Sequence, residues 1–168
     1  MRNGAKAVLA CAAMALAVST VGPALAGASL VKKQTPYFAS ISAGKARMRT
    51  GPGRSYPASW LYQRADLPVK VITVYEKGSW YKVEDPGGTQ GWIMGALISD
   101  TRTALVQGQV TELRDSPRLG GKATWRAAPG GVGRLSKCAR GGCWFDVRGR
   151  GGYVETARLW GVGPDETL

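Results

Sequence analysis

The chain contains no histidine and only three cysteines among its 168 residues. Without histidine it cannot assemble a Ser-His-Asp triad, a Cys-His pair or a histidine-ligated zinc hydrolase centre. The 11 acidic residues form no cluster that suggests glycoside hydrolysis, and Glu84 and Asp85 are expected to point in different directions. A Gly-rich phosphate-binding loop with its lysine is also missing. The sequence therefore predicts a non-enzymatic protein with no catalytic residues, cofactor or metal ion.

Long apolar runs are also scarce, and the one present lies at the N-terminus. A basic start precedes an apolar stretch over 7–21, followed by the small-x-small pattern Ala24-Leu25-Ala26. This pattern predicts a signal peptide over 1–26. The stretch is shorter than the roughly 20 residues that a membrane-spanning helix needs. We expect a periplasmic or secreted protein with no membrane span after signal removal, and an N-terminal membrane anchor is the alternative.

Acidic residues are few, with 11 against 23 lysines and arginines and a net charge of +12. Removal of the predicted signal peptide takes away Arg2 and Lys6 and leaves a net charge near +10. A basic surface attracts polyanions. Because we expect export, nucleic acid is not the predicted partner. The predicted partners are cell-wall carboxylates, lipid phosphates or an anionic envelope polymer. The alternative is that the excess charge only maintains solubility.

The signal peptide carries Cys11, so the mature chain keeps the pair Cys138 and Cys143. An even pair in an oxidising compartment predicts a disulfide. A metal site is the competing interpretation, but two thiols without histidine make a poor ligand set. The pair flanks residues 139–142, an ordinary hairpin length, and closing so short a loop should stabilise the fold by about 2 kcal/mol.

Helical periodicity is absent after residue 27, and turn-forming residues are abundant. The 24 glycines and 9 prolines separate short runs rich in Val, Ile, Tyr and Trp, which is typical of an all-β protein with short strands. The pattern predicts strands over 69–76, 80–84 and 91–94, joined by turns over 77–79 and 85–88.

Three short motifs occur twice in the same order. The first copies are Met48-Arg49-Thr50-Gly51-Pro52, Gly78-Ser79-Trp80-Tyr81-Lys82-Val83 and Gly91-Trp92-Ile93. Their counterparts in 113–117, 142–147 and 152–154 follow 65, 64 and 61 residues later. A duplication therefore predicts two modules of about five short strands each, close to the minimum for a small barrel that hides its edges.

The order Arg-x-Gly-Pro-Gly, Gly-x-Trp-Tyr-Lys-Val, Gly-Trp-Ile resembles that of bacterial SH3-like domains, and in particular an exported two-copy subfamily, over about 38–163. The resemblance implies two tandem small SH3-like β-barrels. The expected division is a signal peptide (1–26), a flexible lead (27–37), a first domain (38–99), a linker (100–109), a second domain (110–163) and a tail (164–168). The second copy departs from the pattern at Ser116, Arg118 and Tyr153, so we expect the first to contribute more to binding.

Strand alternation places two tryptophans outside the expected cores. Tyr81 and Val83 share the apolar face of one strand, which leaves Trp80 and Lys82 on the opposite, charged face. The same alternation directs Trp144 outward in the second copy. An outward tryptophan suits a recognition groove, and in related barrel domains an equivalent tryptophan lines the peptide groove. Alternatively, each ring caps a barrel end or packs between the copies.

Other aromatic and basic residues around the Gly-Pro-Gly turn are candidates for the same groove. Tyr56, Trp60 and Tyr62 follow the turn, whereas Arg49 precedes it and is expected to donate to loop carbonyls or to contact an anionic ligand. The predicted ligand-binding residues are Trp80, Tyr56, Trp60, Tyr62, Arg49, Lys82 and Trp144.

The predicted function is recognition of cell-wall (peptidoglycan) peptide or glycan-peptide through an aromatic groove of the first barrel. The alternative is a charge-driven scaffolding or interaction protein that binds an envelope protein or an anionic envelope surface.

Overall fold

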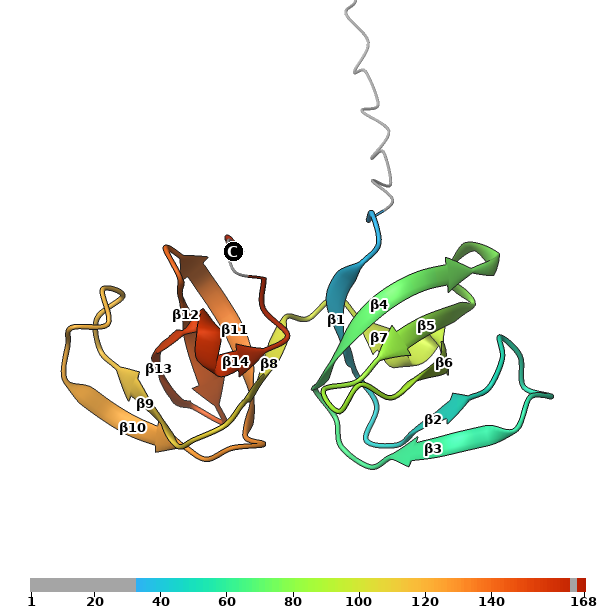
Figure 1. Cartoon of the computed structure of the whole chain (residues 1–168), viewed down its shortest axis with the longest axis horizontal. Coiled ribbons are helices and arrows are strands. Elements are labelled where there is room, and N and C mark those ends of the chain that lie inside the picture. Colours follow the sequence, from blue (N-terminus) through green and yellow to red (C-terminus); the bar gives the residue numbers. More distant parts are fainter. Residues whose placement is uncertain (1–32, 164–165) are drawn as a thin grey trace, which may run out of the picture. The chain divides into compact units, whose positions relative to one another are not determined.

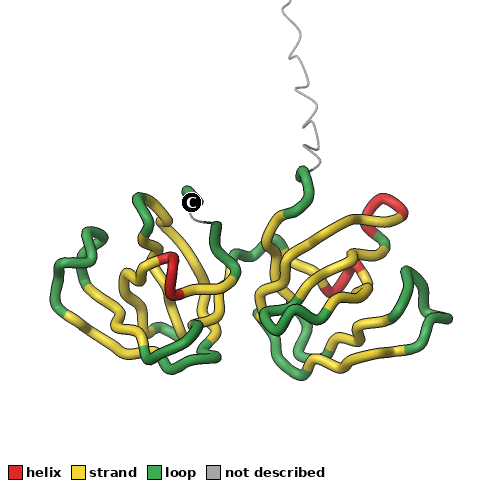
Figure 2. Tube along the Cα trace, in the orientation of Figure 1, coloured by secondary structure: helices red, strands yellow, loops and turns green. Residues whose placement is uncertain are grey.

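The computed structural model describes residues 33–163 and 166–168 (Figure 1). The predicted signal peptide and most of the predicted lead lie outside the described residues. The described part is all-β and forms two seven-stranded antiparallel sheets, one for each sequence copy. Short loops and three turns of 3-10 helix connect the strands (Figure 2). The prediction of two tandem SH3-like barrels is confirmed.

The first sheet has the strand order β3-β2-β6-β5-β4-β1-β7. Its strands are β1 (Tyr37–Ile41), β2 (Ala46–Arg49), β3 (Ala58–Tyr62), β4 (Leu67–Tyr75), β5 (Trp80–Glu84), β6 (Gln90–Met94) and β7 (Ile98–Ser99), with 3-10 turns η1 (Glu76–Gly78) and η2 (Gly95–Leu97). Alternation along the strands directs one face inward. The core is built from the fully buried side chains of Ile41, Met48, Val69, Val83 and Ile93, among others.

The second sheet repeats this order as β10-β9-β13-β12-β11-β8-β14. Its strands are β8 (Thr103–Val106), β9 (Thr111–Arg114), β10 (Ala123–Ala127), β11 (Val132–Ala139), β12 (Gly142–Val147), β13 (Arg150–Glu155) and β14 (Leu159–Trp160), with the 3-10 turn η3 (Thr156–Arg158). Phe145, Leu113, Val106 and Val154 form the centre of its core.

The second sheet begins inside the segment predicted as a linker. β8 occupies residues 103–106 and pairs with β11 and β14, so the connection between the sheets is limited to residues 100–102. The side chains of Thr103, Ala104 and Val106 are fully buried, which explains why this segment is a strand. Each sheet also has two more strands than the five expected per copy. The repeated motifs do not include β1, β7 or their counterparts β8 and β14.

The predicted disulfide between Cys138 and Cys143 is confirmed. Both half-cystines are buried in the second core, where Cys143 packs inward as the alternation predicts. The hairpin is tighter than predicted, because Ala139 pairs with Gly142 and only Arg140 and Gly141 form the turn. Both turn residues have positive φ (53° and 79°), as two-residue hairpin turns require.

Removing this cross-link is expected to destabilise the second barrel by about 2 kcal/mol. The effect is no larger because a short closed loop restricts the unfolded chain less than a long one. Denaturant unfolding of the oxidised protein, with and without reductant, measures the change. A Cys138→Ala/Cys143→Ala variant is the control, because its unfolding should not respond to reductant. Equal unfolding midpoints for the oxidised and reduced wild-type protein would contradict the prediction.

Strand pairing shows that one of the three predicted motif matches is out of register. Val83 lies opposite Gly91 in the first sheet, and Phe145 lies opposite Gly152 in the second. The structural counterpart of Trp80 is therefore Gly142, 62 residues later, and not Trp144. An independent hydrogen bond agrees: the Gly95 amide donates to the carbonyl before Trp80, and the Thr156 amide donates to the carbonyl before Gly142. Trp144 instead corresponds to Lys82.

Candidate functional site

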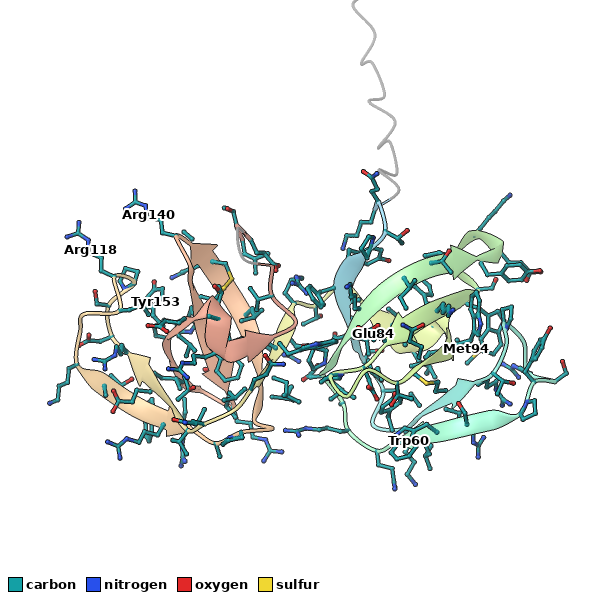
Figure 3. All side chains as sticks on the ribbon, in the orientation of Figure 1. Trp60, Glu84, Met94, Arg118, Arg140 and Tyr153 are labelled. Carbon is teal, nitrogen blue, oxygen red and sulfur yellow. A yellow bond between two sulfur atoms is a disulfide. The ribbon has the colours of Figure 1, made fainter. Side chains whose placement is uncertain are left out.

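A groove of about 550 Å³ opens on the first barrel where β2, β3, β5 and the end of β6 meet. Four basic and four apolar residues line it: Lys45, Arg47, Arg49, Arg54, Leu61, Trp80, Met94 and Leu97. They come from six separate segments of the chain, and Met94 is labelled among the surrounding side chains in Figure 3. No carboxylate belongs to this set. We call it the Trp80 groove.

Alternation along β2 produces the basic wall. Ala46 and Met48 point into the core and are at most 1% exposed. Lys45, Arg47 and Arg49 therefore share the opposite face, roughly 7 Å apart along the strand. Within the described residues, none of the three forms an ion pair. The wall thus presents a row of uncompensated positive charge.

Trp80 belongs to the apolar part of the groove and not to the main core cluster. Its side chain is 9% exposed, less than expected for a groove tryptophan, because Tyr75 and Met94 flank it on the neighbouring strands. Together with Leu61, the ring provides an apolar surface beside the basic wall. This combination suits a ligand with both anionic and apolar groups.

Arg49 makes the loop hydrogen bond predicted from the sequence. Its Nη1 donates to the Tyr56 carbonyl at 2.6 Å, and the equivalent Arg114 donates to the Gly121 carbonyl at 2.7 Å. The Tyr56 ring packs so closely on Gly51 that a Cβ at this position would collide with it. Tyr56 therefore holds the Gly-Pro-Gly loop beside the groove and does not line the groove itself.

The structure separates the other candidates from the groove. Trp60 is 57% exposed on the opposite face of β3 from Leu61, and Lys82 is also outside the lining. Tyr62 is a core residue with 6% exposure, which corrects its assignment as a groove residue. Its hydroxyl donates to Asp85 Oδ2 at 2.8 Å, and burial, followed by this carboxylate, raises the pKa of Tyr62 well above its usual value. Trp144 lies in the second barrel and packs edge-to-face on Tyr153, 5.2 Å between ring centroids.

Of the residues that line the groove, only Arg49 and Trp80 were predicted from the sequence. Lys45 and Arg47 carried a detectable signal, because basic residues at every second position of a strand share a face. The sequence offers no comparable indication for Arg54, Leu61, Met94 and Leu97, since they lie in four different elements, a loop, two strands and a 3-10 turn.

The corresponding groove of the second barrel has lost this character. It measures about 220 Å³. Three basic positions of the first groove change: Lys45 becomes Val110, Arg47 becomes Glu112 and Arg54 becomes Leu119. Two apolar positions become charged, with Glu155 in place of Met94 and Arg158 in place of Leu97. Two acidic residues there balance two arginines. Glu112 pairs with Arg114 at 2.6 Å, and Glu155 approaches Arg158 at 3.9 Å. With Gly142 in place of Trp80, the second groove has neither the positive charge nor the aromatic surface.

A different tryptophan is repeated and exposed in both barrels. Trp60 lies opposite Met48, and Trp125 lies opposite the equivalent Leu113. Hydroxyls of the preceding residues, Ser59 and Thr124, donate to the carbonyls of these partners. The repeat Ala-Ser/Thr-Trp, 65 residues apart, was the sequence signal for this pair and was missed.

The first barrel carries an open groove, and the described ranges contain no cluster of three or more side chains that could hold a metal ion. The family model described as bacterial SH3 domain matches residues 42–100 and 107–161. The chain therefore belongs to the bacterial SH3 domain family, with two copies in tandem. Such domains are typically binding modules and are commonly extracellular or associated with the cell wall.

Among solved structures, NlpC1 and NlpC2 of Trichomonas vaginalis are similar to this chain at 15% identity each, with TM-scores of 0.34. The matches cover 76% and 77% of this chain but only 46% and 49% of those proteins, so the chain spans about half their length. Comparison with curated proteins gave no match. None of the helices in the described part is long and apolar enough to cross a membrane.

Proposed function

We propose that the protein is an exported, non-enzymatic binding module that recognises cell-wall peptide or glycan-peptide in the Trp80 groove. The observation that carries this proposal is the combination of four basic side chains, no lining carboxylate and an apolar surface that includes Trp80. Peptidoglycan stem peptides have matching chemistry, since they present carboxylates together with small apolar side chains.

The spacing of the basic wall favours an extended ligand. Successive groove-facing residues of β2 stand roughly 7 Å apart, a distance comparable to that between alternate side chains of an extended peptide. The guanidinium groups of Arg47 and Arg54 can each donate two parallel hydrogen bonds to a carboxylate. Leu61 and Trp80 then contact the apolar groups of the ligand.

The second barrel supports assignment of binding to the first. It keeps the loop hydrogen bond of Arg114 but replaces the lining charges with internally paired ones. The scaffold therefore folds without the basic, aromatic groove, and maintenance of the fold does not explain the residues of the Trp80 groove.

The net charge, +12 for the full chain and near +10 without the predicted signal peptide, favours a second candidate function, a charge-driven scaffold on an anionic envelope surface or an envelope protein. Ionic strength separates the two, because exposed charges farther apart than about 8 Å are largely screened at physiological salt. Purified peptidoglycan should retain the protein, freed of its signal peptide, at low salt and in part at high salt. Complete release at high salt would favour the charge-driven scaffold, and no retention at low salt would contradict the proposed function.

A further inference from the structure

A second cleft, of about 500 Å³, lies in the second barrel between the β9–β10 hairpin and the turn that joins β12 to β13. Its walls carry Trp125 and three arginines, Arg126, Arg148 and Arg150, and its apolar floor includes Ala127 and Val147. No carboxylate lines it. We call it the Trp125 cleft. It is separate from the Trp80 groove and from that groove's counterpart in the second barrel.

The cleft exists because two side chains of the first barrel have no equivalent here. Tyr62 lies opposite Ala46, and Ala127 lies opposite the equivalent Thr111. In the first barrel the Tyr62 ring fills this place, and its hydroxyl donates to Asp85. Strand register places Val147 at the position of Asp85. Loss of the ring leaves space, and loss of the carboxylate leaves the arginines without a lining counter-charge.

Arginine side chains and the Trp125 ring lie together in the cleft, where a ligand could contact both. The Arg150 guanidinium lies 5.0 Å from the centroid of the Trp125 ring, which holds both side chains in place. Trp125 nevertheless remains 46% exposed. Arg126 pairs with Glu112 at 3.4 Å, whereas Arg148 and Arg150 form no ion pair among the described residues. Two positive charges beside an exposed ring are therefore available to an anionic partner.

The edge of the sheet indicates the shape of that partner. β10 is the terminal strand of the second sheet and pairs only with β9. Thr124, Trp125 and Arg126 on it are exposed. An extended peptide can add to such an edge through its backbone, with alternate side chains directed into neighbouring pockets. A compact anion would use neither the edge strand nor the apolar floor.

We propose that the Trp125 cleft binds an extended acidic peptide segment. The peptide carboxylates pair with Arg148 and Arg150, and an apolar side chain packs between Trp125 and Val147. No residue lines both this cleft and the Trp80 groove, so the protein has two separate binding sites on two copies of one fold.

The test uses a fluorescently labelled octapeptide of alternating Glu and Val and its Lys-Val counterpart, titrated into the protein without its signal peptide. We expect the acidic peptide to bind and the basic one not to bind. Trp125→Ala, and separately Arg148→Ala/Arg150→Ala, should each weaken binding by about tenfold or more. The matched controls Trp60→Ala and Arg118→Ala/Arg140→Ala should change affinity less than about twofold. Arg118 and Arg140 point away from the second barrel in Figure 3.

Ala127→Tyr provides a variant that leaves the charge unchanged, since it restores the ring that fills this place in the first barrel. It should abolish peptide binding while thermal unfolding and near-UV circular dichroism show an intact fold. If the cleft and control arginine variants lose the same affinity for the acidic peptide, net charge alone explains the binding and the proposal is overturned. Polyphosphate binding that depends on Trp125, with no binding of the acidic peptide, would assign the cleft to a different ligand and also overturn it.

Discussion

Exchange of Arg47 for glutamate is expected to weaken peptidoglycan binding by roughly ten- to a hundredfold, or about 1 to 3 kcal/mol. Arg47 lies in the middle of the basic wall on β2, and the second barrel has Glu112 at the same place. The substitution reverses one groove charge and provides an internal partner for the neighbouring arginine, as Glu112 does for Arg114. Sedimentation of the protein with purified peptidoglycan at several concentrations measures the change.

Arg118→Glu is the matched control for this variant. It alters the net charge by the same amount but lies on an exposed loop of the second barrel, outside the Trp80 groove (Figure 3). We expect it to change binding by less than about twofold. If both variants lose affinity equally, the net charge of the protein drives binding and the groove does not.

Replacement of Trp80 by alanine is expected to lower both affinity and stability. The ring is nearly buried, so its removal should destabilise the first barrel by about 3 kcal/mol. This value is at the lower end of the range for replacing a buried aromatic residue by alanine, because Trp80 lies beside a groove and outside the core cluster. Binding should weaken by more than about 1 kcal/mol, as for an aromatic anchor. Denaturant unfolding and peptidoglycan sedimentation measure the two effects separately.

Trp80→Phe distinguishes the binding role of the ring from its packing role. Phenylalanine retains much of the apolar area but has a smaller ring, so most of the stability should remain while affinity still falls. The second barrel folds with Gly142 at this position, which indicates that the ring is not required for the fold. Unchanged binding by a folded Trp80→Ala variant would remove the tryptophan from the site.

The sequence was sufficient to predict the fold class, the duplication and the cysteine pair, because each leaves a local signature. Alternation also placed Val83 in the first core correctly. It could not detect the error that matched Trp80 with Trp144. Side chains on a strand repeat their face every two residues, so a shift of two residues preserves the inward and outward assignments. Only the pairing of β5 with β6, and of β12 with β13, shows the true register.

The composition of the groove was less predictable than the fold. The row Lys45, Arg47 and Arg49 is visible in the sequence once β2 is known, whereas Leu61 and Met94 reach the groove through long-range pairing. Tyr62 illustrates the opposite error. Its place after the Gly-Pro-Gly turn made it a candidate for the groove, but its side chain is buried in the first core, whereas Trp60, which pairs with the same strand, is exposed.

Binding in the Trp80 groove is tested most directly by amide chemical-shift changes in the isotopically labelled protein during titration with a soluble peptidoglycan stem peptide. We predict that the largest changes occur at Lys45, Arg47 and Arg49 and at the indole N–H of Trp80. The equivalent positions of the second barrel, Val110, Glu112 and Arg114, should remain unchanged. Shifts confined to the second barrel, or no shifts at saturating peptide, would contradict the assignment of the ligand to the first barrel.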